Sequence, residues 1–172
     1  QVTGSQISAL DVATGQLETI SAKGGAIVAP DDVAFDPRGN LYVTDSILSG
    51  NISGSHGGAI SVTGSTGAAR IERSTLSGNT STNGGAVSIQ SDRIAWLSQS
   101  TVVANSASAA GGAIRVDAAG ARFVLDYSTI AGNAAPQTSG VHVVSGELLL
   151  HGTVVGEGTG GADCGQSGGN LT

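Results

Sequence analysis

Tyr42, Arg70 and Trp96 have side chains suited to ligand contact, and they occupy equivalent positions in a repeated pattern. Each lies four residues before a serine of that pattern, and Glu72 and Asp126 lie two residues before such serines. An exposed aromatic ring beside an arginine and carboxylates suits a sugar, which offers an apolar face and hydroxyl groups. These five residues are the candidate ligand-binding residues. The alternative is that Trp96 is covered by a loop or only completes the surface of a sheet.

The repeat that positions these residues is marked by a column of asparagines. Asn51, Asn79, Asn105 and Asn133 follow one another in steps of 28, 26 and 28 residues, and Glu157 takes the same place 24 residues later. The surrounding text also recurs, as SILSGN, STLSGN and STIAGN, each followed by a glycine or glycine pair and aliphatic residues. A fixed period of this length predicts stacked structural repeats.

Within one repeat, apolar and polar residues alternate with a period of two, which is typical of a strand. The third residue before each serine and the second after it are apolar and are predicted to point inward: Val43, Ile71, Leu97, Leu125 and Leu149, then Leu48, Leu76, Val102, Ile130 and Val154. After the glycines, aliphatic residues are predicted to point in, whereas Ser61, Ser88, Arg115 and His142 point out. Each repeat therefore supplies about three short strands, and the coils stack into an all-β parallel β-helix.

Two polar columns are predicted to be structural. Asparagine tolerates the left-handed conformation of a tight turn, and its amide can bond to the coils above and below. We expect the asparagine column to form such a ladder. The serine column, Ser46, Ser74, Ser100 and Ser128 followed by Gly152, is expected to do similar work at a narrow corner.

The pattern STxxxN, a variable loop, then GG and an aliphatic residue resembles the right-handed parallel β-helix repeat proteins of bacterial surfaces. These are similar to polymorphic outer-membrane proteins and to pectate-lyase-like folds. The resemblance covers residues 46–172 and includes the ending ADCGQSGGNLT. It implies an extracellular or cell-surface protein with a right-handed parallel β-helix of about five coils, because the five serine-column positions mark one coil each.

Residues 1–45 differ from the repeats that follow. The segments QISALDVATGQLETI and PDDVAFDPRGNLYVTDS resemble one blade of a gluconolactonase-like or NHL-type β-propeller, with a turn at Asp36 to Asn40 and a strand from Leu41. One blade alone cannot carry the metal site of such propellers. We predict that residues 1–45 serve as an N-terminal cap or an irregular first coil, because an uncovered first rung would expose unpaired strand edges.

Three functions remain open for the outer surface. The leading hypothesis is a carbohydrate- or partner-binding face without evident catalytic machinery, with polysaccharide as the candidate partner. The second is a polysaccharide lyase, which needs a carboxylate cluster for calcium and a base, or a glycoside hydrolase, which needs two carboxylates at the right separation. Glu72 and Asp126 lie two rungs apart, about 10 Å, at the edge of the inverting range. The third is an ice-binding surface on the row Ile47, Thr75, Thr101, Thr129 and Thr153.

Composition narrows the partners. The formal charge is −6 with seven basic residues, which argues against nucleic acid, and no apolar run approaches the roughly 20 residues of a membrane span. His56, His142 and His151 fall on different faces without metal-ligand spacing, so we predict neither metal nor cofactor. Cys164 is the single cysteine, a free thiol or the partner of a cysteine elsewhere. The ending Gly169 to Thr172 has no evident polar cap, which leaves end-to-end self-association open.

Overall fold

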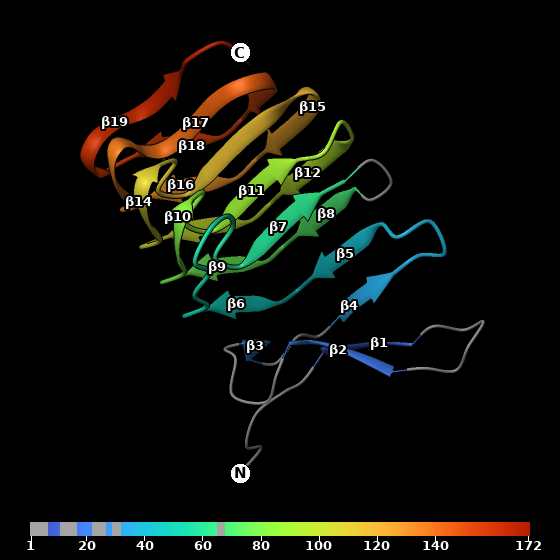
Figure 1. Ribbon diagram of the computed structural model, residues 1–172. Coiled ribbons are helices and arrows are strands. Elements are labelled where there is room, and N and C mark those ends of the chain that lie inside the picture. The colour runs from blue at the N-terminus through green and yellow to red at the C-terminus, as the bar shows by residue number, and fades with distance from the viewer. Residues whose placement is uncertain (1–6, 11–16, 22–26, 29–31, 65–67) are drawn as a thin grey trace.

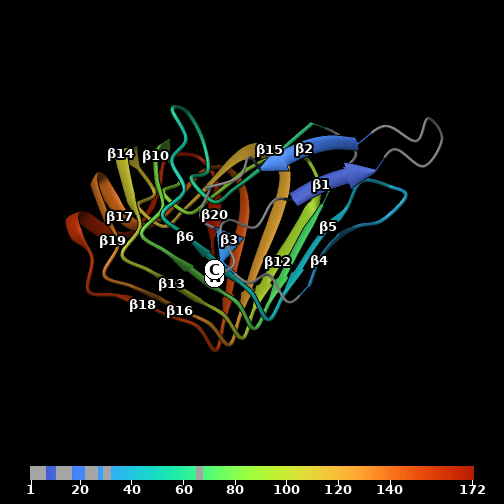
Figure 2. The ribbon, with the colours of Figure 1, turned by 90° about the horizontal axis from the view of Figure 1, so that it is seen from below.

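A computed structural model describes residues 7–10, 17–21, 27–28, 32–64 and 68–172. These residues form strands and turns, and no helix occurs among them. Successive coils stack into a parallel β-solenoid of about five coils (Figure 1), which confirms the predicted all-β architecture. Seen from the N-terminal end in Figure 2, the coils turn clockwise as they recede from the viewer, so the solenoid is right-handed.

The first face of the solenoid carries the candidate binding residues and takes one strand or strand end from each coil. Its parallel rungs are β5 (Leu41–Thr44), β8 (Ala69–Glu72), β12 (Ile94–Ser98), the C-terminal parts of β15 (Ile114–Asp126) and β17 (Ala134–His151), and β20 (Asn170–Leu171).

The second face is a separate sheet of short strands. Its parallel rungs are β6 (Ile47–Ser49), β9 (Thr75–Ser77), β13 (Thr101–Val103), β16 (Thr129–Ala131) and β18 (Val154–Gly156).

The third face follows the glycine pairs. Its rungs are β7 (Ile60–Thr63), β11 (Val87–Gln90), the N-terminal part of β15, the middle of β17, and β19 (Thr159–Gln166). Just before the glycine pairs, β10 (Thr80–Asn83) pairs with β14 (Ser106–Ala110). The glycines have a steric role here. A Cβ atom added at Gly85 would lie 2.0 Å from the carbonyl oxygen of Gly112 in the next coil, so a side chain would push the coils apart.

The aliphatic columns form one continuous core between the three faces. Ile71, Leu97 and Leu125 are completely buried, as predicted for the third residue before each serine. The second residue after each serine packs against this column from the second face. Leu76, Val102 and Ile130 are accordingly also completely buried. Each buried side chain of this size contributes about 1.5–3 kcal/mol relative to an exposed one.

Both predicted ladders are present. The backbone N–H of Asn79 donates to Oδ1 of Asn105 at 2.9 Å, and the N–H of Asn105 donates to Oδ1 of Asn133 at 2.9 Å. In the serine column the N–H of Ser74 donates to Oγ of Ser100 at 3.0 Å. These side chains satisfy backbone groups at corners where strand pairing stops.

The predicted register of the last coil is wrong by one residue. Leu125 pairs with Leu150 rather than Leu149, and Thr129 pairs with Val154. Val154 is therefore 64% exposed instead of inward, whereas Leu148, in register with Phe123, is completely buried. A slip of one residue turns every side chain of a strand to the opposite face.

The serine and asparagine columns follow the same one-residue shift in the last coil. The N–H of Ser128 donates to Oγ1 of Thr153 at 3.3 Å, so Thr153 rather than Gly152 continues the serine column. Gly158 rather than Glu157 follows Asn133, because Ala134 pairs with Thr159.

The cause lies in the turn before the first face. Where β15 pairs with β17, the register moves from Asp117 opposite Ser145 to Arg122 opposite Glu147, so the later coil lacks three residues of this turn. Gly146 has a φ of 86°, which allows the shorter connection.

The N-terminal strands pair antiparallel. β3 (Ile27–Val28) pairs with β6, and β4 (Asp32–Phe35) pairs with β5 through the predicted turn at Asp36 to Asn40. β1 (Ile7–Leu10) and β2 (Leu17–Ser21) form a separate hairpin. Parallel stacking begins at β5, whose partner is β8. The propeller resemblance and the role of residues 1–45 as a cap stay predictions.

Candidate functional site

Tyr42, Arg70 and Trp96 lie side by side on the first face. Tyr42 pairs with Arg70, and Arg70 pairs with Trp96, on three adjacent parallel strands. The three side chains point outward because the next residue of each strand fills the core. Tyr42 is 39% exposed, Trp96 is 37% exposed and the Arg70 side chain is 55% exposed. The structure thus places three of the five candidate residues in one accessible row.

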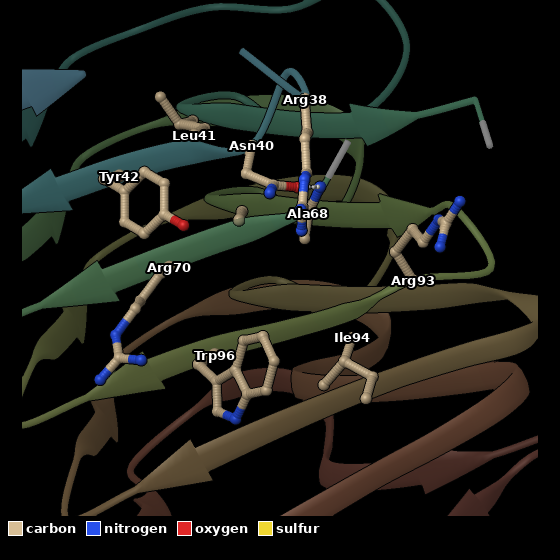
Figure 3. A pocket seen from close by; sticks show the side chains of 10 residues that line it. Arg38, Asn40, Leu41, Tyr42, Ala68, Arg70, Arg93, Ile94 and Trp96 are labelled. Carbon is tan, nitrogen blue, oxygen red and sulfur yellow. Dashed lines mark hydrogen bonds between the residues drawn. The ribbon is translucent and has the colours of Figure 1, made fainter. Parts of the chain in front are cut away.

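This row borders a surface pocket of about 730 Å³ (Figure 3). Besides the row, its walls contain Arg38, Arg93 and Ile94. Figure 3 shows Arg38 extending over Ala68, with Arg93 on the far side of that residue. The small side chain of Ala68 leaves space in the rung between Asn40 and Ile94, which are larger. With Leu41, the pocket therefore combines two aromatic rings, two large aliphatic residues and three guanidinium groups.

One wall of the pocket is fixed by the turn between β4 and β5. The Asp36 carboxylate accepts hydrogen bonds from the N–H of Arg38 at 2.8 Å and the N–H of Asn40 at 2.9 Å, and from the Asn40 side-chain amide at 2.7 Å. The backbone bond from Asn40 is the main reason why the pKa of Asp36 lies below its usual value. The Asn40 Oδ1 atom accepts the N–H of Ala68 at 2.9 Å and so ties the turn to the next coil.

Glu72 lies beside the pocket rather than in its walls. Its carboxylate accepts a hydrogen bond from Nε of Arg70 at 2.5 Å and lies 3.5 Å from Nη1 of Arg73. Arg73 also binds Asp45 through two nitrogens at 2.8 and 2.7 Å, and this pairing lowers the pKa of Asp45. The Glu72 carboxylate is therefore already shared between two arginines.

Asp126 belongs to a different part of the first face. It shares its outward column with Glu72, but Ser98 lies between them. Its Oδ1 atom lies 2.6 Å from Nδ1 of His151, and the His151 ring meets the Tyr127 ring edge-on with the centroids 5.0 Å apart. The five candidate residues thus divide into a pocket row, a carboxylate that supports it and a separate carboxylate–histidine pair.

Sequence reasoning missed Arg38, Arg93 and Ile94. Ile94 had a usable signal, because it lies two residues before Trp96 in the same strand and so shares its face. Arg38 and Arg93 lie outside the strands, in connections that differ from coil to coil, so the repeat could not align them.

The polar residues of the third face form a second cluster. His142 is 4% exposed; its Nδ1 lies 2.7 Å from Oγ1 of Thr138, and its Nε2 lies 2.9 Å from Oγ of Ser167. Burial, and then the charge of Arg115 on the neighbouring rung, lower the pKa of His142. Arg115 itself donates to Asp117 at 2.7 Å. Its Nε atom is buried without a partner among the described residues.

The remaining sequence candidates occupy separate places. Cys164 is a free and exposed cysteine in register with Val141, and desolvation together with the nearby Asp163 carboxylate raises the pKa of its thiol. On the second face, Thr129 is followed by Val154 rather than Thr153, so the threonine row has an aliphatic residue at each end. Across the described ranges, no three His, Cys, Asp or Glu residues form a group suited to a metal ion.

Comparison with protein families finds a match to the Chlamydia polymorphic membrane protein repeat over residues 45–63. This stretch contains the first serine–asparagine motif and the glycine pair that follows it. The match supports a repeat of the bacterial surface or outer-membrane type. Neither the curated proteins nor the solved structures include a significant match. In the part of the chain that the structure describes, no helix is long and apolar enough to span a membrane.

Proposed function

We propose that this chain is a surface β-solenoid that binds a carbohydrate chain in the pocket between Tyr42 and Trp96. The observation that carries the proposal is the pair of exposed aromatic rings on either side of Arg70. They lie two rungs apart, about 10 Å, on one face. Two rings at this separation suit sugar units that are next but one along a chain, because each ring can cover the apolar face of one sugar and a third unit lies between them over Arg70.

The surrounding polar groups support the same ligand. Arg38 and Arg70 supply guanidinium N–H donors at the edge of the pocket, and sugar hydroxyls and ring oxygens can accept from them. Because the rings lie on paired strands and the Asp36–Asn40 turn is tied to the next coil, the site is already formed without ligand. Binding then requires little ordering of the protein, which favours affinity.

Binding without cleavage is favoured over catalysis by the state of the two carboxylates. Glu72 is engaged by Arg70 and Arg73, and Asp126 is engaged by His151 on a different part of the face. A glycoside hydrolase needs one carboxyl group as an acid and a second as a base or nucleophile, both facing the scissile bond.

The test uses Trp96, the single tryptophan of the chain, as the reporter. Titration with neutral and acidic oligosaccharides should change its fluorescence, and calorimetry should show binding that Trp96→Ala weakens by about tenfold or more. The control is Tyr127→Ala, which removes an aromatic residue that is 61% exposed outside the pocket. Product analysis of each mixture would reveal shortened or unsaturated fragments, the outcome expected of the enzyme hypothesis. If no saccharide changes fluorescence or heat, the proposed function is wrong.

A further inference from the structure

We propose that the ligand is an anionic carbohydrate, whose carboxylate or sulfate groups are bound by the arginines of the pocket; this rests on the proposed function. The chain has a formal charge of −6, yet three of its seven basic residues, Arg38, Arg70 and Arg93, line this one pocket. Among the described residues that line it there is no carboxylate. A local excess of positive charge on an acidic protein concentrates anions at that place and repels them elsewhere.

The bonding of Arg70 leaves donors for a ligand. Glu72 accepts from Nε of Arg70, so the two terminal Nη groups take no part in that bond. Because Glu72 also lies within 3.5 Å of Arg73, its charge is divided between two guanidinium groups. Glu72 therefore orients Arg70 and neutralises it only in part.

Arg38 is held in place by its backbone, while its side chain is unpaired as far as the described residues show. Its N–H donates to the Asp36 carboxylate at 2.8 Å, which fixes the start of the side chain. Its guanidinium group has no ion pair with any described residue, and it extends over Ala68 into the pocket (Figure 3). Arg93 adds a third positive charge from the neighbouring coil. A guanidinium group binds carboxylate and sulfate oxygens through paired N–H groups, which a neutral sugar cannot match.

Three ligands of related composition test this inference. The first is an oligogalacturonide with free carboxylates, the second is its methyl ester with the same backbone and no charge, and the third is a sulfated galactan oligosaccharide without carboxylates. We expect the free acid, the sulfated ligand or both to bind at least about tenfold more tightly than the ester, a difference that decreases as salt rises. Preference for one anionic ligand over the other identifies carboxylate or sulfate as the natural group.

Variants separate charge from shape. Arg38→Gln and Arg70→Gln together should reduce binding of the preferred anion by about tenfold or more and leave binding of the ester unchanged. The matched control is Arg122→Gln, which lies on the same face but pairs with Glu147 at 3.1 Å. Equal affinity for acid, sulfate and ester would overturn this inference while the proposed function stands. If the unaltered, folded chain binds none of the three ligands, that result would instead contradict the proposed function itself.

Discussion

Asn105 illustrates how single side chains hold the corners of this solenoid. It is 1% exposed, its amide donates to the carbonyl of Leu76 at 2.9 Å and to Oδ1 of Asn133 at 3.0 Å, and its own Oδ1 accepts the N–H of Asn79. The N–H of Asn79 lies in the turn between β9 and β10, beyond the strand ladder, whereas Leu76 is the middle residue of β9. The asparagine therefore replaces strand pairing where the chain changes direction.

Replacing Asn105 with Ala should destabilise the fold by about 2–3 kcal/mol, because the N–H and the side-chain amide of the buried Asn79 would both lose their acceptor. Urea unfolding followed by circular dichroism measures this loss. Asn51→Ala is the control, since Asn51 is half-buried and no described residue donates to its Oδ1 atom. Equal effects of the two substitutions would mean that the ladder adds nothing beyond local turn propensity.

His142 should make stability dependent on pH. Its pKa in the folded state lies below the 6.5 expected for the unfolded chain. At pH values between the folded-state pKa and 6.5, the unfolded chain therefore binds more protons than the folded one. The contribution is present above pH 6.5 and is lost as pH falls, with a slope of no more than about 1.4 kcal/mol per pH unit for one proton.

Urea unfolding at several pH values should show this decline, and His142→Gln should flatten it. An unchanged slope in the variant would place the titrating group elsewhere.

At the scale of the strands, the sequence predicted the first four coils because each keeps the same anchors. The serine and asparagine of each motif fix the register, so Leu97 and Leu125 point inward as expected. The last coil has Thr153 at the serine position and Gly158 at the asparagine position. Because neither residue type matches the earlier coils, the sequence alone does not align this coil. The missing three residues of the preceding turn left the alignment unconstrained, and the register slipped by one.

The candidate site was predictable to the same extent. Tyr42, Arg70 and Trp96 lie in one row because strand register alone determines it. Arg38 and Arg93 reach the pocket from turns whose lengths vary, and the direction of a turn residue does not follow from a period of two. The charge of the pocket, on which the ligand class depends, was therefore not apparent from the sequence.

Two neighbouring leucines test the corrected register. Leu148→Ala should cost about 2–5 kcal/mol because Leu148 is completely buried, whereas Leu149→Ala should cost less than about 1.5 kcal/mol because Leu149 lies half-buried in the outward column. Both changes remove the same atoms, so their difference in unfolding free energy reports burial alone. A larger effect for Leu149 would restore the register predicted from the sequence.

At the scale of the whole molecule, the N-terminal end of the stack is marked by antiparallel strand pairing, in contrast to the parallel pairing between coils. At the N-terminal end, β3 and β4 pair antiparallel with β6 and β5, the strands of the first coil. An antiparallel partner uses the backbone groups that another chain would otherwise pair with. A cap formed by residues 1–45 would require such pairing, and the capping role stays a prediction.

Removing residues 1–36 should expose the edges of β5 and β6 and cause self-association with the β content retained. Size-exclusion chromatography and a melting curve measure this. Deletion of residues 1–22 is the control, because it removes β1 and β2 but leaves β3 and β4 on the edge. If both shortened chains elute and melt like the full chain, the N-terminal strands have no capping role.

The nearly constant coil length also affects how the chain folds. Successive rungs of the asparagine ladder are joined by hydrogen bonds across 28, 26 and 28 residues. The entropy lost in closing a loop depends on the logarithm of its length, so every coil pays nearly the same cost for docking onto its neighbour. Folding can therefore begin at any coil and proceed in both directions. A longer solenoid of the same repeat would gain stability with each coil and would never have to close a longer loop.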